Sequence, residues 1–418
     1  MNKAPIKTLH LTNAYHQASG GIGVFYRNLL EAANEHERFT RLVVPAAKTR
    51  VEEIGKFARI FHVKARRAMF GDARYRLMLP TQYLFSDQTA LRQILLQEQP
   101  DLIEICDKYA LNWLAGMIRK GFIKGLRRPV LVGLSCERMD DNVRAYVGRG
   151  DFFRKLARMY MGTCYIPMFD YHIANSEYTA TELRQAMRHK HKREIFICPP
   201  GAGFEHLENA ERTPENRELL LNQIGGNQKT ALLLYVGRLS KEKNIPLLVE
   251  MMKSLSYDES KDYHLLIAGD GPLANWLASD GMSKAHRRLS LLGHISDTAA
   301  LANLYANCDA FVHPNPREPF GIAPLEAMTA NLPLVAPEAG GVLSYANSTN
   351  AWLGHADGES FADSVRLLFA DAHKREQKVI RARQTAREYT WNSIMAKLFA
   401  LYDEMHERFP TLPFAQKA

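Results

Sequence analysis

Two glutamates, Glu318 and Glu326, lie eight residues apart in the segment HPNPREPFGIAPLEAM (313–328). Three prolines within six residues restrict the backbone before Phe320, and Pro324 suits the first turn of a helix. Free N–H groups at the start of that helix could bind a diphosphate. Each carboxylate could accept two hydrogen bonds from a sugar diol. The segment therefore predicts a site for a diphosphate next to paired hydroxyl groups.

A second segment, GRLSKEKN (237–244), places two cations directly after an expected strand. The Arg238 guanidinium could bind a phosphate with two hydrogen bonds, and the Lys243 ammonium would add a compact positive charge. A solvated basic turn is the alternative interpretation of this segment. Together with the two glutamates, however, the cations favour a phosphate site.

A third segment, SGGIG (19–23), lies between the first expected strand and its helix. Gly20 and Gly21 would let backbone N–H groups approach a phosphate at the N-terminus of that helix. The spacing is not that of the G-x-G-x-x-G dinucleotide motif. An ordinary tight turn explains the glycines equally well.

The elements that would position these residues alternate between short apolar runs and stretches of helical period, which is typical of parallel sheets covered by helices. In the first half we expect strands at 6–11, 39–44, 101–105, 130–134, 172–174 and 195–198, and helices at 23–34, 111–120 and 176–186. In the second half we expect strands at 231–236, 264–268, 289–292, 310–313 and 334–336, and helices at 246–255, 297–306, 324–330 and 361–389. A polar segment, 209–227, is expected to connect the halves.

The sequence thus predicts an α/β protein with two doubly wound, Rossmann-like domains. Its 418 residues exceed one ordinary domain of about 100–200 residues. In such sheets, ligands bind beyond the carboxyl ends of the strands. We expect the two domains to face each other across a cleft.

The net charge of +9 is divided unevenly along the chain. Residues 1–200 contain 32 Lys and Arg and 19 Asp and Glu, a balance of +13, which leaves −4 for the remainder. A nucleic-acid-binding protein is disfavoured, because carboxylates and glycines organise the acidic half. The five cysteines are widely spaced and predict reduced thiols rather than a disulfide framework or a metal site. No signal peptide and no apolar run of about 18–20 residues is visible, so we expect a cytoplasmic protein, peripheral to a membrane at most.

At the glutamate segment the chain resembles the retaining glycosyltransferases of family 4, which have the GT-B fold. Glu318 and Glu326 match the glutamates of the family signature, within P-x-x-x-E-P-F-G-x-x-x-L-E-A-M. The other landmarks follow in order: Gly20-Gly21, Gly237-Arg238 with Lys243, GDGP (269–272), GHI (293–295), Gly340-Gly341 and YTW (389–391). The resemblance is strong over 231–345 and looser before residue 200. It implies an acceptor-binding domain at 1–203, a nucleotide-sugar-binding domain at 204–394, and a last helix (395–418) that packs back on the first domain.

The resemblance also implies roles for individual residues. Arg238, Lys243 and Glu318 would be catalytic: the two cations would hold the diphosphate, and Glu318 would bind hydroxyl groups of the donor sugar. Glu326 would bind the ribose. Further substrate-binding residues would be Gly20, Gly21, Cys136, Gly237, Gly271, His294, Ile295, Phe320, Gly321, Ile322 and Ala323. The family needs neither metal nor cofactor, because fixed cations stabilise the leaving group.

Three departures from the family pattern lie in the first half, at the domain junction and after the Gly340-Gly341 pair. Cys136 stands where many relatives have a histidine, Ala202-Gly203 replaces the usual valine and aspartate of the junction, and Ser344 or Tyr345 replaces a glutamate. The acceptor side is therefore not standard.

Three basic clusters lie in the first half, at 59–76, 118–128 and 184–193. Aromatic residues interleave with the first of them, a pattern that fits an anionic membrane surface, whereas solvated helix faces are the alternative. By analogy with phosphatidylinositol mannosyltransferases, we expect a hexose from GDP-mannose or a UDP-hexose to reach a lipid or lipid-linked glycan. A soluble or polysaccharide acceptor, or a sugar-nucleotide epimerase of the same fold, are the alternatives.

Overall fold

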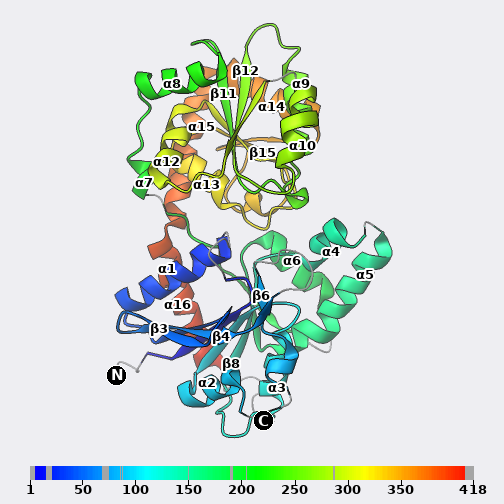
Figure 1. Cartoon of the computed structure of the whole chain (residues 1–418), viewed down its shortest axis with the longest axis vertical. Helices are drawn as coiled ribbons and strands as arrows, with labels where there is room; N and C mark the ends of the chain where they lie inside the picture. Colours follow the sequence, from blue (N-terminus) through cyan, green and yellow to red (C-terminus); the bar gives the residue numbers. More distant parts are fainter. Residues whose placement is uncertain are drawn as a thin grey trace. The chain divides into compact units, whose positions relative to one another are not determined.

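The computed structural model describes residues 5–15, 21–67, 75–84, 86, 88–148, 150–188, 192–203, 205–285 and 288–409. The chain divides into two compact units, drawn in Figure 1. The first unit comprises residues 1–201 and 391–418, and the second comprises residues 202–390. The chain therefore passes into the second unit at Ala202, and the C-terminal segment of the first unit begins at Trp391 rather than at residue 395.

The first unit is built on an eight-stranded sheet. Its strands are β1 (Thr8–Thr12), β2 (Thr40–Ala46), β3 (Arg50–Ile54), β4 (Ala58–Lys64), β7 (Leu102–Cys106), β8 (Val130–Ser135), β9 (Tyr171–Ala174) and β10 (Glu194–Ile197). In the order β10-β9-β8-β7-β1-β2-β4-β3, every neighbouring pair is parallel except β3 with β4. A short antiparallel pair, β5 (Arg66–Arg67) with β6 (Arg76–Leu77), stands apart.

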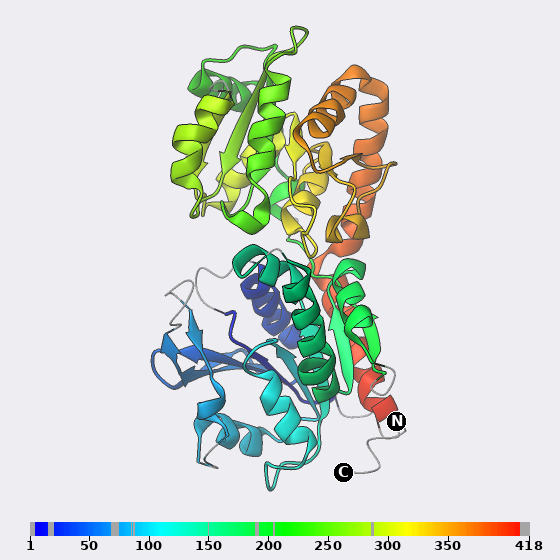
Figure 2. The ribbon, with the colours of Figure 1, turned by 90° about the vertical axis from the view of Figure 1, so that its right-hand side faces the viewer.

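Helices cover the sheet of the first unit (Figures 1 and 2). They are α1 (Gly21–Glu35), α2 (Ala90–Glu98), α3 (Asn112–Arg119), α4 (Met139–Tyr146), α5 (Asp151–Tyr160), α6 (Glu177–Ala186) and α16 (Trp391–Arg408). Because helices lie on both faces, β1 and β7 are buried along their whole length, as parallel strands usually are.

The second unit has a six-stranded sheet in which all neighbouring pairs are parallel. Its order is β13 (Leu289–Gly293), β12 (Tyr263–Ala268), β11 (Ala231–Val236), β14 (Ala310–Val312), β15 (Leu334–Pro337) and β16 (Trp352–Gly354). Its helices are α7 (Glu205–Glu208), α8 (Pro214–Ile224), α9 (Pro246–Leu255), α10 (Ala274–Trp276), α11 (Met282–Lys284), α12 (Thr298–Asn307), α13 (Ile322–Thr329), α14 (Gly358–Ala370) and α15 (Ala372–Ala386). Two apolar clusters pack on this sheet, one containing Leu232 and Leu234 and the other Leu233 and Tyr235. Alternate residues of β11 thus point to opposite faces.

The polar segment expected to be a connection, 209–227, contains helix α8. Thr213 caps the helix by accepting a hydrogen bond from the amide of Asn216 at 3.2 Å, Pro214 occupies its first turn, and Gly225 ends it with a φ of 65°. These are the usual start and stop signals of a helix. The expectation of a connecting segment was therefore wrong over residues 214–224.

Helix α16 is held on the first unit by a buried polar group. The Tyr402 hydroxyl donates to one oxygen of Glu104 at 2.5 Å, and the other oxygen lies 3.0 Å from Nδ1 of His10. Glu104 and His10 have no exposed surface. Because a buried carboxylate is costly without partners, these contacts fix the position of α16 on β1 and β7.

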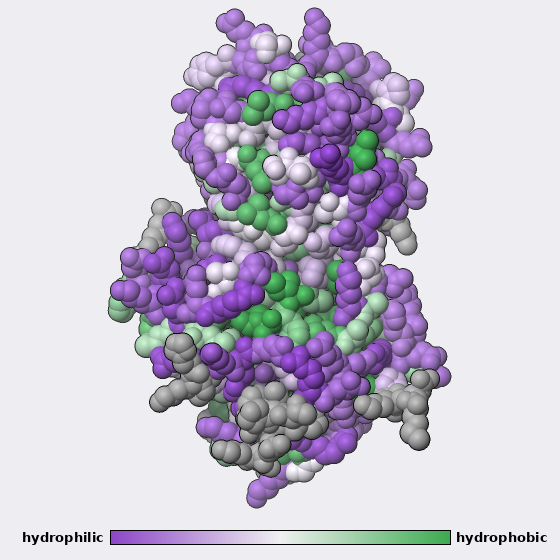
Figure 3. Space-filling view, turned by 180° about the vertical axis from the view of Figure 1, so that it is seen from behind, coloured by the Kyte–Doolittle hydropathy of each residue, from purple (hydrophilic) through white to green (hydrophobic). Residues whose placement is uncertain are grey.

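The surface of the described residues is mostly hydrophilic, with hydrophobic residues gathered on part of the first unit in the view from behind (Figure 3). The edge strand β10 leaves Ile197 exposed. Within the described ranges, no helix has both the length and the apolar character required to span a membrane.

Candidate functional site

The candidate site of the second unit lies where its strand order changes direction. From β11 the chain adds β12 and β13 on one side and then β14 to β16 on the other, so the loops after β11 and β14 leave neighbouring strands at the carboxyl edge. Such switch points hold the ligand in doubly wound sheets. Backbone hydrogen bonds tie the loops together: the Gly237 amide donates to Ala268 at 3.0 Å, and the Gly269 amide donates to Gly293 at 2.7 Å.

The loops after β11 and β14 meet in an ion pair. The Nζ atom of Lys243 lies 2.9 and 2.7 Å from the two carboxylate oxygens of Glu318, which is the pair of residues that the sequence singled out. Asn315 donates its side-chain amide to Glu318 at 3.1 Å, and Asn244 donates to the carbonyl of Pro314 at 3.0 Å. The lysine and the glutamate are thus brought together by the fold and held by two asparagines.

The surroundings of the Glu318 carboxylate keep it charged. Burial opposes the charged form, but the cation of Lys243 and the hydrogen bond from Asn315 act against it, and the pKa of Glu318 lies below its ordinary value. Burial lowers the pKa of His313 to about 4, so this histidine is neutral at pH 7. The Lys243 side chain is 28% exposed, so a ligand could reach its ammonium group.

Gly321 precedes α13 with a φ of 89°, a conformation that favours glycine. No side chain caps this helix, so the amides of Ile322 and Ala323 lack a capping partner among the described residues. The Tyr345 hydroxyl donates to the carbonyls of Phe320 and Gly321, at 3.2 and 2.5 Å. These bonds orient the turn whose N–H groups the sequence predicts to bind a diphosphate.

Glu326, in α13, is half-buried and has a different environment from Glu318. The Tyr305 hydroxyl donates to one of its carboxylate oxygens at 2.9 Å. Burial raises the pKa of Glu326, and the hydrogen bond from Tyr305 only partly opposes that rise. One carboxylate oxygen is thereby fixed, and the group keeps further capacity to accept hydrogen bonds.

The other predicted residues of the second unit lie on the same edge of the sheet. Arg238 is exposed, and among the described residues its guanidinium has no acceptor, while its carbonyl accepts from Tyr235 at 3.1 Å. Gly271 follows β12, His294 is exposed directly after β13, and Ile295 packs partly against the core. The prediction for Gly20 falls outside the described residues, whereas Gly21 is the first residue of α1.

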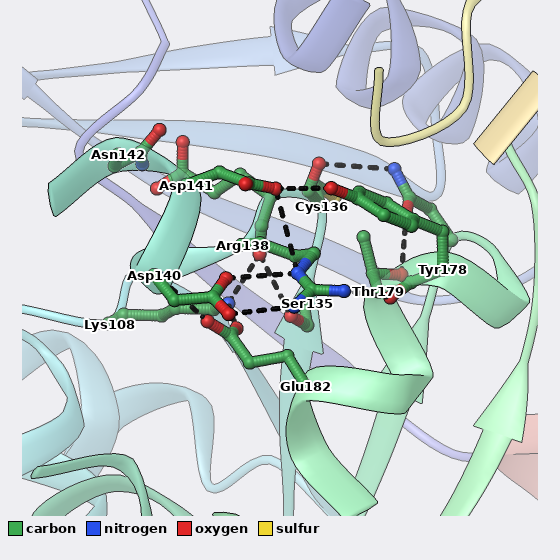
Figure 4. Close-up of polar contacts among 12 residues, drawn as sticks. Lys108, Ser135, Cys136, Arg138, Asp140, Asp141, Asn142, Tyr178, Thr179 and Glu182 are labelled. Carbon is green, nitrogen blue, oxygen red and sulfur yellow. Dashed lines mark hydrogen bonds and ion pairs between the residues drawn. The ribbon is translucent and has the colours of Figure 1, made fainter. Parts of the chain in front are cut away.

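The first unit carries a polar cluster after β7 and β8, shown in Figure 4. The buried Lys108 contacts Glu182 at 2.8 Å, and Arg138 contacts Asp140 at 2.7 Å. The amide of Asp140 donates to Glu182 at 2.9 Å, which joins the two pairs. The cluster is therefore a connected network at the carboxyl edge of the first sheet, the edge at which its own ligand would bind.

Cys136 lies beside this network, at the end of β8. Its carbonyl accepts a hydrogen bond from Asn175 at 3.1 Å, and its sulfur lies 3.9 Å from that of Cys106. All five cysteines are free. Across the residues that the structure describes, no group of three or more His, Cys, Asp or Glu is arranged to hold a metal ion.

Several cations of the three basic clusters are engaged within the first unit. The paired residues are Arg59 with Glu53 and Glu98, Arg119 and Arg128 with Asp170, Arg184 with Glu177, and Arg193 with the carbonyl of Phe169. Asp170 is fully buried, so its two arginines hold elements of the fold together. Much of the charge that the sequence places on these clusters is therefore structural.

The two doubly wound units, a match to a family model and the similar proteins described next show that the chain is a glycosyltransferase of the GT-B type. Residues 216–385 match the family model described as glycosyl transferases group 1.

The chain is similar to glycosyltransferases and synthases with different names. The chain is 24% identical to a GDP-mannose-dependent alpha-(1-6)-phosphatidylinositol dimannoside mannosyltransferase of Mycobacterium tuberculosis, over 96% of this chain and 97% of the relative. Among solved structures, sucrose-phosphate synthase of Thermosynechococcus elongatus superposes with a TM-score of 0.73 at 18% identity, over 96% and 99% of the two chains. Anabaena HepE in complex with UDP and glucose gives a TM-score of 0.68 at 18% identity, over 96% and 100%. The structural likeness shows the GT-B fold.

Sequence reasoning missed the residues that hold the site in shape. Asn315 and Asn244 support the loop of Glu318, Tyr305 fixes Glu326, and Tyr345 orients Gly321. Asn315 lies within the glutamate segment, so its position three residues before Glu318 was a usable signal. The two tyrosines are distant in sequence, and only the fold reveals them.

Proposed function

We propose that the chain transfers a hexose, with retention of the anomeric configuration, from a nucleotide-diphosphate sugar to a hydroxyl group of a lipid or lipid-linked glycan at a membrane surface. GDP-mannose is the first candidate donor, and a UDP-hexose is the alternative. The observation that carries the proposal is the contact between Lys243 and Glu318 beside the uncapped start of α13.

In this proposal the cations of the second unit stabilise the leaving group. Negative charge develops on the diphosphate as the bond to the sugar breaks, and preorganised positive charge is worth most at that point. Arg238 is free to bind phosphate, Lys243 can bind it while still touching Glu318, and the amides of Ile322 and Ala323 add two donors. The reaction then needs no metal ion.

The two glutamates would divide the hydroxyl groups of the donor between them. Glu326 keeps an oxygen that Tyr305 does not occupy, which suits the ribose hydroxyls. Glu318 is held charged by its neighbours and would accept hydrogen bonds from the sugar. The pKa of Glu318 is lowered and that of Glu326 is raised, which agrees with the two carboxyls binding different hydroxyl groups of the donor.

A lipid acceptor is supported by two independent observations. The mycobacterial relative, which matches this chain over 96% of its length, is named for a phosphatidylinositol dimannoside substrate. Residues 1–200 carry a charge balance of +13, and positive charge is attracted to anionic lipids. The name of the sucrose-phosphate synthase indicates the alternative, a small soluble acceptor.

The test is a transfer assay with purified protein. GDP-mannose, UDP-glucose and related donors are incubated with vesicles containing phosphatidylinositol or its mannosides, with and without EDTA, and the products are identified by mass spectrometry and their anomeric configuration by NMR. We expect a glycosylated lipid formed equally well in EDTA. Transfer only to soluble acceptors, an inverted anomer or a metal requirement would contradict the corresponding part of the proposal, and a released epimer without acceptor would indicate an epimerase.

Two substitutions test the assigned cations. Arg238→Ala and Lys243→Ala should each lower turnover by about a hundredfold or more, because each removes a preorganised charge. Lys229→Ala is the matched control, since Lys229 is an exposed lysine just before β11, at the opposite edge of the same sheet. Unchanged turnover in Arg238→Ala, or an equal loss in the control, would refute the assignment.

A further inference from the structure

Helix α5 exposes a stripe of large apolar side chains. Phe152, Leu156 and Met159 are 71%, 46% and 53% exposed. They follow one another at intervals of four and three residues, which places them on one side of a helix, within about 60° of rotation at 100° per residue. Val147, which closes α4, is 66% exposed. A soluble surface helix normally turns such a stripe toward the core.

The rest of α5 shows that this stripe is not a misplaced core face. Ala157 is buried, Phe153 is half-buried, and the Tyr160 hydroxyl donates to the carbonyl of Lys108 at 2.9 Å and accepts from Asn112 at 3.2 Å. The helix thus has its own face against the first unit. The apolar stripe is a second, separate face.

The third face of α5 is cationic. Arg154, Lys155 and Arg158 are exposed, and helical rotation places them between the apolar stripe and the buried face on the far side. Arg154 contacts Asp151 at 3.1 Å, and Arg158 donates to the side chain of Gln185 at 3.0 Å, both at the surface. The exposed half of the helix is therefore apolar along one stripe and positively charged along the next.

Further exposed aromatic residues lie beside α5. Tyr109 and Trp113, which are 51% and 38% exposed, directly follow Lys108 and Asn112, the two residues to which Tyr160 is bonded. Figures 1 and 2 both place α5 on the outside of the first unit, with no other helix or strand of that unit drawn over its outer side. We refer to the exposed apolar residues on and near α5 together as the α5 patch: Tyr109, Trp113, Val147, Phe152, Leu156 and Met159.

We infer that the α5 patch docks on the surface of a bilayer that contains anionic lipid, with α5 lying in the plane of the interface. Exposed Phe, Leu and Met beside a stripe of Lys and Arg are the features of interfacial helices, and the positive stripe complements anionic headgroups. A protein partner for the same patch is the other possible occupant, but it would not explain why all the cations lie along one border of the apolar stripe. The inference rests on the proposed lipid acceptor and assigns the docking to α5 rather than to the three basic clusters.

The position of α5 in the chain connects docking with the acceptor. In the polar network, Arg138 directly precedes α4 and Glu182 lies in α6, and Tyr160 of α5 is bonded to the backbone of Lys108. A bilayer bound by α5 would therefore present headgroups close to the carboxyl edge of β7 and β8. This explains how one helix can serve a reaction on an amphiphilic acceptor.

The first experiment is flotation with vesicles of phosphatidylcholine alone or with 30 mol% phosphatidylglycerol, at two salt concentrations. We expect the wild type to float with the anionic vesicles and less at high salt. Replacing Phe152, Leu156 and Met159 together by Ser should lower the partition coefficient at least tenfold. Replacing Arg154, Lys155 and Arg158 together by Gln should lower it by about tenfold to a hundredfold on anionic vesicles only, since each cation is worth up to about fivefold. The matched control is Leu219→Ser with Tyr257→Ser, two exposed apolar residues of the second unit.

The second experiment identifies the segment that enters the bilayer. In Phe152→Trp, the added indole should be quenched by brominated lipids in anionic vesicles beyond the quenching of the wild type, whereas Leu219→Trp should not. Flotation unaffected by either triple replacement, or equal quenching in both tryptophan variants, would overturn the inference. Loss of self-association or of protein binding in the apolar variant, without any vesicle binding by the wild type, would indicate the protein partner instead.

Binding of the donor separates this inference from the proposed function. The triple variants should retain binding of GDP-mannose, measured by calorimetry, because α5 belongs to the first unit and the donor residues to the second. If the wild type docks through α5 but transfers sugar only to soluble acceptors, the docking stands and the proposed lipid acceptor fails. If it glycosylates lipid in detergent but never binds vesicles, the docking fails and the proposed function stands.

Discussion

Replacing Lys243 by Met should destabilise the second unit, because it leaves the Glu318 carboxylate buried without its cation. The Glu318 side chain is only 10% exposed and that of Lys243 is 28% exposed. Breaking a fully buried ion pair costs about 3–5 kcal/mol, whereas an exposed pair is worth about 1 kcal/mol or less. With a partly exposed lysine we expect a loss of about 2 kcal/mol at pH 7. For a unit of about 190 residues, that loss lowers Tm by about 4–8 °C.

The pH dependence of this loss follows from the pKa of Glu318. In the wild type this pKa is lowered, so the carboxylate contributes stability above its unfolded pKa of about 4.3, and that contribution is lost as the pH falls through the folded pKa. Without Lys243, the cation that stabilises the charged form of Glu318 is missing, so burial should raise the pKa of Glu318. The deficit of Lys243→Met relative to the wild type should therefore shrink between pH 7 and pH 4, as Glu318 takes up a proton.

A double-mutant cycle with Glu318→Gln measures the contact itself. Hydrogen exchange of the amides in β11 and β14 reports the opening free energy of the second unit in the wild type, the two single variants and the double variant. We expect Lys243→Met to cost about 1 kcal/mol or less in the Glu318→Gln background. Equal costs in both backgrounds, or a deficit that grows on acidification, would refute the reasoning.

Three further outcomes test other parts of the molecule. Gly269→Ala should lower the free energy of unfolding of the second unit by about 3 kcal/mol in a urea titration, or prevent folding, because the added Cβ would lie 1.9 Å from the carbonyl oxygen of Gly237. The control Gly225→Ala has open space around the added Cβ and should cost about 1 kcal/mol in the same titration. Burial lowers the pKa of His172 to about 3, so the first unit should lose about 2 kcal/mol between pH 7 and pH 5 as only the unfolded state takes up the proton, and His172→Gln should abolish this slope. Tyr402→Phe should cost about 1–3 kcal/mol in urea unfolding of the first unit, by leaving Glu104 one donor short; an unchanged midpoint would contradict that role.

The fold of the second unit was largely predictable from local patterns. The strand 231–236 and the helix 246–255 have the expected bounds, because an apolar run and an amphipathic run are each delimited by clear signals: Gly237 after the strand and Pro246 at the start of the helix. Lys243 and Glu318, both singled out from the sequence as candidate site residues, are in contact in the structure. Their contact depends on β11 and β14 being adjacent, which the order of the chain alone does not state.

Charged residues obscure the pattern of some of the elements that sequence reasoning missed. Strand β3 lies at the edge of its sheet and exposes Arg50 and Val51, so the alternation of a buried strand is weak there. Helix α5 was missed because its exposed half carries both apolar and basic residues. Tyr305 and Tyr345 act from outside the glutamate segment, through contacts that only the tertiary fold creates.

Helix α16 gives the two units different positions in the order of synthesis. The second unit is continuous from residue 202 to 390, but the first unit begins at the N-terminus and receives α16 only after all of the second has been made. During translation, His10 and Glu104 are made before the whole second unit, and Tyr402 is made after it. The contact between Glu104 and Tyr402 therefore forms only after the second unit has been synthesised. The first unit is thus started first and completed last. Its nascent form, in which α16 does not yet cover Glu104, is the species available for a chaperone to bind.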